Sequence, residues 1–154
     1  MPGHEEQKTL AYAADELFLV VADVKEYPSF VPWCSGARIR SEDQHEIIAD
    51  LEIGFGPFRE SFTSKITLDR PRQVQVHAIE GGPLEHLMNT WTFTPVSDGT
   101  HVDFVIDFVF KSHLLDHAAN SMFHEAATRM MSAFESRAHL VHMLTQRHRQ
   151  HPPS

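Results

Sequence analysis

Cysteine is almost absent from this sequence, which contains a single one, Cys34, among 154 residues. An internal disulfide needs two cysteines and a thiolate-rich metal site needs several, so both are excluded. No uninterrupted apolar run approaches the roughly 20 residues that a membrane-spanning helix requires. The N-terminal segment MPGHEEQK is polar and acidic, unlike a secretory signal peptide. These features predict a soluble cytoplasmic protein with at most a peripheral contact to the inner membrane.

Positive charge is also scarce, because 13 Lys and Arg residues stand against 21 Asp and Glu residues, a net charge of −8 with neutral histidines. Proteins that bind nucleic-acid backbones normally present a basic surface. The balance therefore argues against DNA binding and disfavours a ribosomal partner. The length and the 42% hydrophobic content predict one globular domain over residues 1–144. Residues 145–154 are polar and are predicted to form a flexible tail.

Catalytic motifs are missing as well: the sequence contains no GxSxG, no HExxH and no phosphate-binding glycine loop. We therefore predict no enzyme, no catalytic residue and no catalytic cofactor. Cys34 lies in an aromatic, proline-bounded segment, which favours a small buried hydrophobe over a nucleophile. His113 and His117 are four residues apart and His124 follows. A metal site needs a third ligand and supporting hydrogen bonds, which the sequence does not indicate, so no metal is predicted.

The hydrophobic pattern changes along the chain from helical to alternating. Residues 9–24 have apolar side chains at helical spacing, and Asp15 lies near the amino end, where a carboxylate suits the helix dipole. Pro28 and Pro32 then bound a compact apolar segment. From residue 36 to 111 the alternation is typical of half-buried strands. Five successive strands are predicted, over residues 45–55, 58–69 and 72–80, around Leu87, Trp91 and Phe93, and from the turn at 97–99 to Phe110.

Such a meander has one apolar face that another element must cover. The segment 114–144 contains no proline or glycine and predicts one long amphipathic helix, with Ser112 as its N-cap. The expected fold class is therefore α+β, a curved antiparallel sheet around a long C-terminal helix. Large aromatic residues on the sheet would face alanines and methionines on the helix. They can interdigitate as a packed core or leave a cavity, and the pattern leaves both outcomes open.

Two motifs resemble the coenzyme-Q-binding START-domain family, a branch of the polyketide cyclase/START-like, or helix-grip, superfamily. They are Val21-x-Asp23-Val24-x-x-Tyr27-Pro28-x-Phe30-Val31-Pro32-Trp33-Cys34 and Ala133-Phe134-Glu135-x-Arg137-Ala138. The resemblance extends over about residues 9–141. It implies a START/Bet v 1-like fold, in which a first strand and two short helices precede the rest of a seven-stranded sheet and a long helix. It also implies a non-catalytic carrier or chaperone that binds ubiquinone (coenzyme Q) in an internal cavity and supports respiration.

Two other functions are attached to the same fold, and the fold does not choose between them. Some bacterial members of the family that the sequence resembles are ribosome-association toxins that block subunit joining. Other members of the superfamily cyclise or dehydrate polyketides, for which Glu60 would have to act as a general base. For the carrier, the expected partners are an isoprenoid quinone or similar lipid and, transiently, a membrane surface. Ubiquinone would then be a ligand and not a cofactor.

The inward-facing side chains of the predicted strands and helix form the expected ligand wall. Binding of a polyprenyl tail needs only apolar area, about 25 cal/mol per Å². A quinone ring also needs polar groups, and Glu60 and Asn89 share the apolar register of their strands. A β-bulge or a place at the rim of the sheet would instead expose either residue. The predicted ligand-binding set is Phe58, Glu60, Phe62, Leu87, Asn89, Trp91, Phe93, Phe104, Phe108, Met122, Ala126 and Met130.

Overall fold

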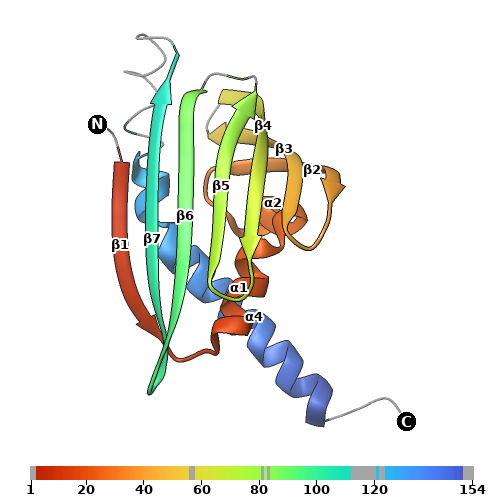
Figure 1. Cartoon of the computed structure of the whole chain (residues 1–154), viewed down its shortest axis with the longest axis vertical. Coiled ribbons are helices and arrows are strands. Elements are labelled where there is room, and N and C mark those ends of the chain that lie inside the picture. The colour runs from red at the N-terminus through yellow and green to blue at the C-terminus, as the bar shows by residue number, and fades with distance from the viewer. Residues whose placement is uncertain are drawn as a thin grey trace.

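In the computed structural model, a seven-stranded antiparallel sheet curves in front of the C-terminal helix (Figure 1). Strands β2 to β7 are neighbours in chain order, and β1 pairs with β7 at one edge. The structure describes residues 3–55, 58–80, 82, 84–111, 121 and 124–150, with the backbone alone at 55, 58, 80 and 147–150. The elements are β1 (Gly3–Leu10), α1 (Ala14–Ala22), a 3₁₀ turn (Val24–Glu26), α2 (Tyr27–Phe30), β2 (Cys34–Glu42), β3 (Glu46–Phe55), β4 (Phe58–Asp69), β5 (Gln73–Glu80), β6 (Leu84–Val96), β7 (Gly99–Phe110) and α4 (Met130–Gln150).

The predicted meander is confirmed, including the hairpin turn between β6 and β7. Gly99 ends this turn with a φ of +145°, a conformation that side chains strongly disfavour. A Cβ atom at Gly99 would lie 2.1 Å from the carbonyl oxygen of Leu10. Glycine therefore allows the end of β1 to pass close to this hairpin.

The N-terminal helix is shorter than the apolar spacing predicts. Thr9 and Leu10 belong to β1, where they pair with His101 and Thr100 of β7, and α1 begins only at Ala14. Pairing with the edge of the sheet overrides the helical pattern here, because strand preference depends mainly on tertiary context. Asp15 lies in the first turn of α1, as expected, but no side chain caps the helix.

The C-terminal helix differs from the prediction at both ends. The described residues are helical at 124–128, form a turn at Arg129, and continue as α4 to Gln150. The helix thus extends six residues past Leu144, into the segment where a flexible tail was expected. Ser112 and most of the predicted N-terminal half of the helix lie outside the described residues. No helix in the described part of the chain is long and apolar enough to cross a membrane.

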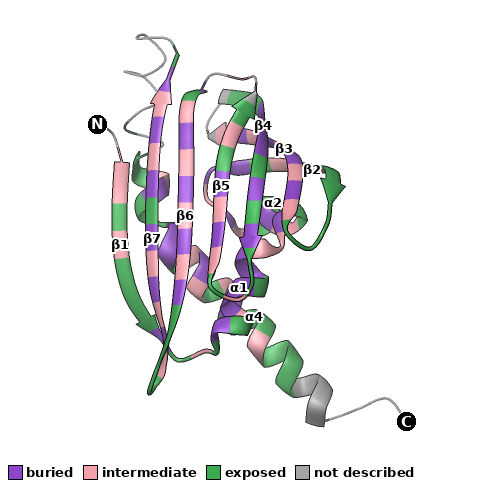
Figure 2. Ribbon diagram, in the orientation of Figure 1, coloured by how far each residue is buried: buried purple, intermediate pink, exposed green. Residues whose placement is uncertain are grey.

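The core lies between the concave face of the sheet and the helices α1 and α4, and buried residues alternate along β6 and β7 (Figure 2). Trp91 is central to it, since its ring centroid is 4.5 Å from those of both Phe104 and Phe134. An apolar void of about 10 Å³ remains beside Trp91 and Phe93, room for about one water molecule. Of the two outcomes left open by the sequence, this part of the interior is packed.

The proline-bounded segment after α1 closes the core at one side, as its composition predicts. Tyr27 is buried and its hydroxyl donates a hydrogen bond to the carbonyl oxygen of Val21. Burial also raises the pKa of Tyr27 far above its usual value. Trp33 is buried with its ring centroid 6.2 Å from that of Phe62 on β4. These aromatic side chains fix the short helix α2 against the sheet.

Candidate functional site

The concave face of the sheet brings most of the predicted ligand wall together. Met130 of α4 is buried opposite the sheet and Ala126, just before it, is half-buried. Met122 and the side chain of Phe58 lie outside the described residues. The role of this wall in binding a ligand stays a prediction. Its buried members on β4, β6 and β7 are Phe62, Leu87, Trp91, Phe93, Phe104 and Phe108.

Asn89 is the polar residue that the structure buries within this wall, and only 2% of its surface is exposed. It pairs across the sheet with Val76 and Ile106, which are both buried and apolar. The side-chain oxygen of Asn89, Oδ1, has no hydrogen-bond partner among the residues that the structure describes. A buried polar atom without a partner costs about 1–3 kcal/mol, and native proteins rarely retain one without a reason.

The surroundings of Asn89 are apolar along its own strand. On one side along β6 lies Trp91, which packs against Phe104 and Phe134. On the other side lies Leu87, which pairs with Phe108 of β7. In such a low-dielectric environment a hydrogen bond to a ligand oxygen is stronger than in water. The amide of Asn89 is therefore suited to orient one polar ring inside a largely apolar site.

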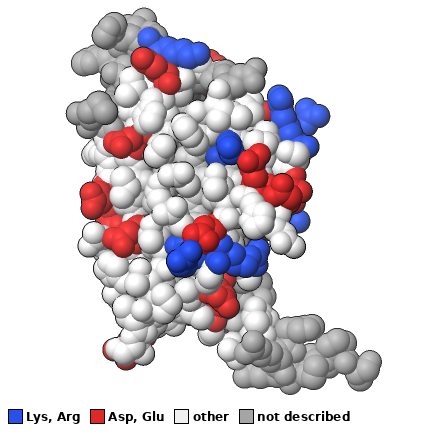
Figure 3. Space-filling view, in the orientation of Figure 1, with Lys and Arg blue, Asp and Glu red and all other residues white. Residues whose placement is uncertain are grey.

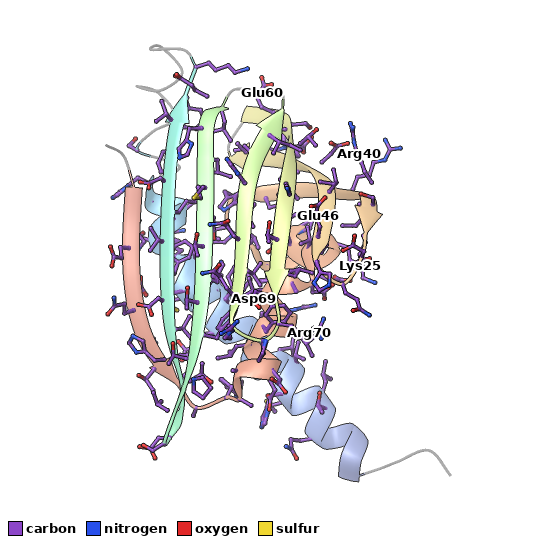
Figure 4. All side chains as sticks on the ribbon, viewed as in Figure 1. Lys25, Arg40, Glu46, Glu60, Asp69 and Arg70 are labelled. Atoms are coloured by element: carbon purple, nitrogen blue, oxygen red, sulfur yellow. The ribbon has the colours of Figure 1, made fainter. Side chains whose placement is uncertain are left out.

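Glu60 has the same predicted register but a different environment. It pairs with the buried Ile53 of β3, so it lies on the concave side of the sheet, yet it is exposed. Figure 4 places Glu60 at the upper end of β4, and the strand begins only two residues earlier, at Phe58. Of the alternatives left open by the sequence, the structure shows the rim: Glu60 shares the inward register, but water reaches it. Its role in binding a ligand stays a prediction.

Two buried residues of the interior were not in the predicted set. Ser64 is fully buried between Phe62 and Ile66, and its hydroxyl donates a 3.0 Å hydrogen bond to the carbonyl oxygen of Ala49. The alternation along β4 identifies Ser64 as inward, so the signal was present in the sequence. Phe134 lies in the predicted apolar stripe of the helix, but its contact with Trp91 depends on how α4 packs on the sheet.

Cys34 is buried, which confirms the interpretation of this residue as a small hydrophobe. Its thiol donates a 3.3 Å hydrogen bond to the carbonyl oxygen of Gly36. Burial raises the pKa of Cys34 from 9.0 to about 11, so the thiol is protonated at neutral pH. No group of three metal-binding side chains occurs within the described part of the chain. His124 is exposed, and His113 and His117 lie outside that part.

The outer face of β2, β3 and β4 contains a groove of about 460 Å³ lined by side chains of both charges. Figure 3 shows acidic and basic side chains interspersed on the visible face of the molecule. Arg40 forms a 2.8 Å ion pair with Asp50, and Thr63 donates a hydrogen bond to the same carboxylate. The guanidinium of Arg40 is the main cause that lowers the pKa of Asp50. Asp50 and Glu52 therefore offset the positive charge of Arg38 and Arg40 in this groove.

Comparison with known proteins gives matches over most of the chain. The chain is 37% identical over 142 residues to the ribosome association toxin RatA of Rickettsia prowazekii, covering 90% of this chain and 97% of the toxin. It is 34% identical over 139 residues to a mitochondrial coenzyme Q-binding protein of Xenopus laevis. That match covers 88% of this chain but only 57% of the longer Xenopus protein.

Solved structures agree with the architecture. The solution structure of an 18 kDa protein from Caulobacter crescentus is 37% identical, with a TM-score of 0.70 over 92% of this chain and 99% of that one. An aromatase/cyclase from Streptomyces matches with a TM-score of 0.73 over 89% and 93% of the two chains. At 22% identity the second match shows the fold alone. Residues 10–135 match the family described as polyketide cyclase/dehydrase and lipid transport, and the chain therefore belongs to that family.

Proposed function

We propose that this protein binds an isoprenoid quinone, ubiquinone in the first place, between the concave face of the sheet and the C-terminal helix, as a non-catalytic carrier. The observation on which this depends is the buried amide of Asn89, whose oxygen has no partner among the described residues of an apolar wall. Two comparisons support it: the description of the family includes lipid transport, and one relative is a coenzyme Q-binding protein.

The chemistry of the amide fits both redox forms of a quinone. The oxidised ring has carbonyl oxygens, which accept hydrogen bonds, whereas the reduced ring has hydroxyl groups, which donate them. The side-chain amide of Asn89 has a carbonyl oxygen that accepts hydrogen bonds and an NH₂ group that donates them. Rotation about the last side-chain bond exchanges the positions of the two groups. One residue can therefore hold the ring before and after reduction without taking part in the redox reaction.

The packing indicates which side of Asn89 the tail would occupy. The interior beside Trp91 and Phe93 has only a 10 Å³ void, so a tail there would have to displace aromatic side chains. We therefore place it on the opposite side, along Leu87 and Phe108. The helix offers adaptable or small side chains, Met130 and Ala126, for such a guest.

An enzymatic reading has less support from the described residues. Glu60 is exposed, so no apolar pocket prepares its carboxylate for proton transfer. Cys34 is protonated at neutral pH and its thiol is engaged with Gly36. A polyketide cyclase would need at least one acid–base group facing its substrate.

Ribosome binding is the second candidate function, because the 37% identity to a ribosome association toxin extends over nearly the whole of both chains. The outer groove of β2–β4 argues against it, since acidic side chains offset its arginines. Salt-sensitive co-sedimentation with an isolated ribosomal subunit would support the toxin. The carrier predicts no such co-sedimentation.

The decisive experiment is organic extraction of the protein purified from its native host, followed by mass spectrometry for isoprenoid quinones. The proposal expects a nearly stoichiometric amount of quinone in the wild type. The amount bound should be smaller in the variant Met130→Trp, in which a larger side chain fills the space beside the sheet. Cooperative urea unfolding of this variant would show that it still folds. An extract without any enriched lipid would contradict the carrier.

A further inference from the structure

The outer end of α4 exposes apolar side chains instead of burying them. Ala138 is the last residue of the helix that is buried among those described. Beyond it, Leu140, Met143 and Leu144 are 47%, 53% and 55% exposed, and Val141 is 37% exposed. Figure 2 shows this end of α4 as a largely exposed segment that projects past the lower edge of the sheet. We call residues 140–144 the projecting segment.

Polar side chains of the same turns face the protein. His142 lies 2.8 Å from the carboxylate of Glu16 on α1, and His139 forms a 2.9 Å hydrogen bond with the hydroxyl of Tyr12. A surface helix normally turns its apolar side to the core and its polar side to solvent. The projecting segment reverses this arrangement, and an exposed apolar surface of this kind indicates a second binding partner.

The charge of α4 indicates what kind of partner this is. From Ser136 to its end at Gln150 the helix contains three arginines, Arg137, Arg147 and Arg149, and three histidines but no acidic residue. Arg137 is engaged within the protein, over the ring of Phe30 and 3.9 Å from Glu26, so the remaining arginines are those of the last turn, Arg147 and Arg149. The whole chain has a net charge of −8. The exposed apolar side chains thus belong to a locally basic helix on an acidic protein, a combination that matches anionic lipid surfaces.

We propose that the projecting segment docks on an anionic membrane surface. Leu140, Met143 and Leu144 would enter the boundary between headgroups and acyl chains, next to the last turn of α4, whose sequence contains Arg147 and Arg149. The inference deepens the proposed function, because it names the surface at which a lipid carrier meets its source. The docking step itself needs no bound quinone.

A second copy of this chain fits the projecting segment less well. In a two-fold dimer each patch contacts its own counterpart, so the basic helices would face one another. Four partly exposed apolar side chains also offer only a few hundred Å², whereas a stable interface buries roughly 800 Å² per partner. A membrane requires neither a large area nor a matching protein surface.

The position of the projecting segment makes it a tether. It lies at the lower end of the sheet, whereas Glu60 marks the upper end (Figures 1 and 4). Docking through α4 would therefore hold the domain at the bilayer while the Glu60 end of the sheet stays free. Membrane binding and quinone binding thus depend on different residues and can be tested separately.

Vesicle co-sedimentation tests the proposal with the intact protein. We expect binding to phosphatidylcholine vesicles that contain one third phosphatidylglycerol, weaker binding to phosphatidylcholine alone, and release by added salt. The double variant Leu140→Gln/Leu144→Gln should lower the partition coefficient about tenfold or more, because two apolar side chains no longer insert. The matched control is Ile79→Gln on β5, a residue that is 50% exposed, and it should bind like the wild type.

Three results would overturn the tether: no vesicle binding by the wild type, equal binding by the double variant, or a dimer that the double variant dissociates while vesicle binding is unchanged. The quinone extraction remains independent. Vesicle binding by a protein without quinone would keep the tether and remove the carrier, and the reverse result would keep only the carrier.

Discussion

Asn89 is expected to lower the stability of the fold that contains it, since its buried Oδ1 loses water on folding and gains no partner in the described part of the chain. A leucine, which is similar in size, would pack against the neighbouring Leu87 and Trp91 without burying a polar atom. Ser64 shows the contrast, because it is equally buried on the same side of the sheet but hydrogen-bonded to Ala49. One inward polar residue thus serves the fold, while the other is available to a ligand.

Replacement of Asn89 should separate stability from binding. In the ligand-free protein we expect Asn89→Leu to raise the free energy of unfolding by about 1 kcal/mol, because an unpartnered polar atom is removed. The affinity for a short-chain ubiquinone should fall about fivefold, the effect of one lost hydrogen bond. Urea unfolding and fluorescence titration would measure the two quantities.

The control for this prediction is Ser64→Ala, which removes a satisfied hydroxyl. It should lower the free energy of unfolding by about 1 kcal/mol and leave quinone affinity unchanged. If Asn89→Leu destabilises the protein and binds quinone like the wild type, Asn89 has a structural role and the proposed ring contact is wrong.

The thiol of Cys34 predicts a stability change at alkaline pH. Its pKa is 9.0 when unperturbed and about 11 in the folded protein, because burial disfavours the thiolate. Between these values the unfolded chain loses its proton and the folded chain does not, so stability is complete below pH 9 and falls as the pH rises to 11. The loss should reach about 2 kcal/mol in urea unfolding. Cys34→Ala should remove that part of the slope, and an unchanged slope would contradict the buried thiol.

At the scale of elements, four buried side chains attach α4 to the rest of the protein: Met130, Met131, Phe134 and Ala138. Phe134 is the aromatic one among them. Phe134 packs its ring on Trp91 of the sheet and on Tyr27 and Phe30 of α2, with centroids 4.5, 5.9 and 5.0 Å away. Surface contacts add less, among them a 2.6 Å ion pair between Lys8 and Glu135, since exposed pairs contribute little.

Truncation of Phe134 therefore tests how α4 is attached. Phe134→Ala should lower the free energy of unfolding by about 3–5 kcal/mol, through lost burial and the cavity that remains. Leu144→Ala on the same helix should change it by less than about 0.5 kcal/mol, because that side chain is 55% exposed. Similar effects of both substitutions in urea unfolding would show that α4 does not pack as described.

The elements could be predicted from the sequence where local pattern and tertiary contacts agree. The alternation along β3, β4 and β7 corresponds to the strands observed. Thr9 and Leu10 continue a helical pattern but join β1, because the edge of β7 offers them backbone hydrogen bonds. The end of α4 could not be predicted either, since its exposed side chains lack the core contacts that define a helical stripe.

The candidate site shows the same limit of prediction. One alternation rule placed Asn89 and Glu60 on the inner side of the sheet, and the register agrees for both. Their burial differs because Glu60 is two residues from the start of its strand, whereas Asn89 is mid-strand. How deeply an inward-facing residue is buried depends on which other elements cover that end of the sheet. The sequence of a single strand contains no information about this cover.

For the whole molecule, the family comparisons leave one fold with two named activities among its relatives, ribosome association and coenzyme Q binding. The carrier needs an interior that accepts a lipid, and the described core beside Trp91 is closed. Loading therefore has to use the side of Asn89 away from Trp91, along Leu87 and Phe108, where burial of the apolar tail would provide most of the binding free energy. A ligand that binds there binds only the folded protein, so it makes the loaded fold more stable.

The last prediction follows from this coupling. Protein stripped of lipid and then given quinone at about one hundred times its dissociation constant should gain roughly 2.7 kcal/mol, because the ligand binds only the folded state. For a chain of this length the melting temperature should rise by roughly 5–10 °C in differential scanning calorimetry. A lipid of similar apolar area without a quinone ring should produce a smaller shift, and Asn89→Leu should abolish the difference between the two ligands. Equal shifts in the wild type would mean that the protein selects apolar area alone, and no shift with either ligand would remove the carrier and leave ribosome association as the function to test.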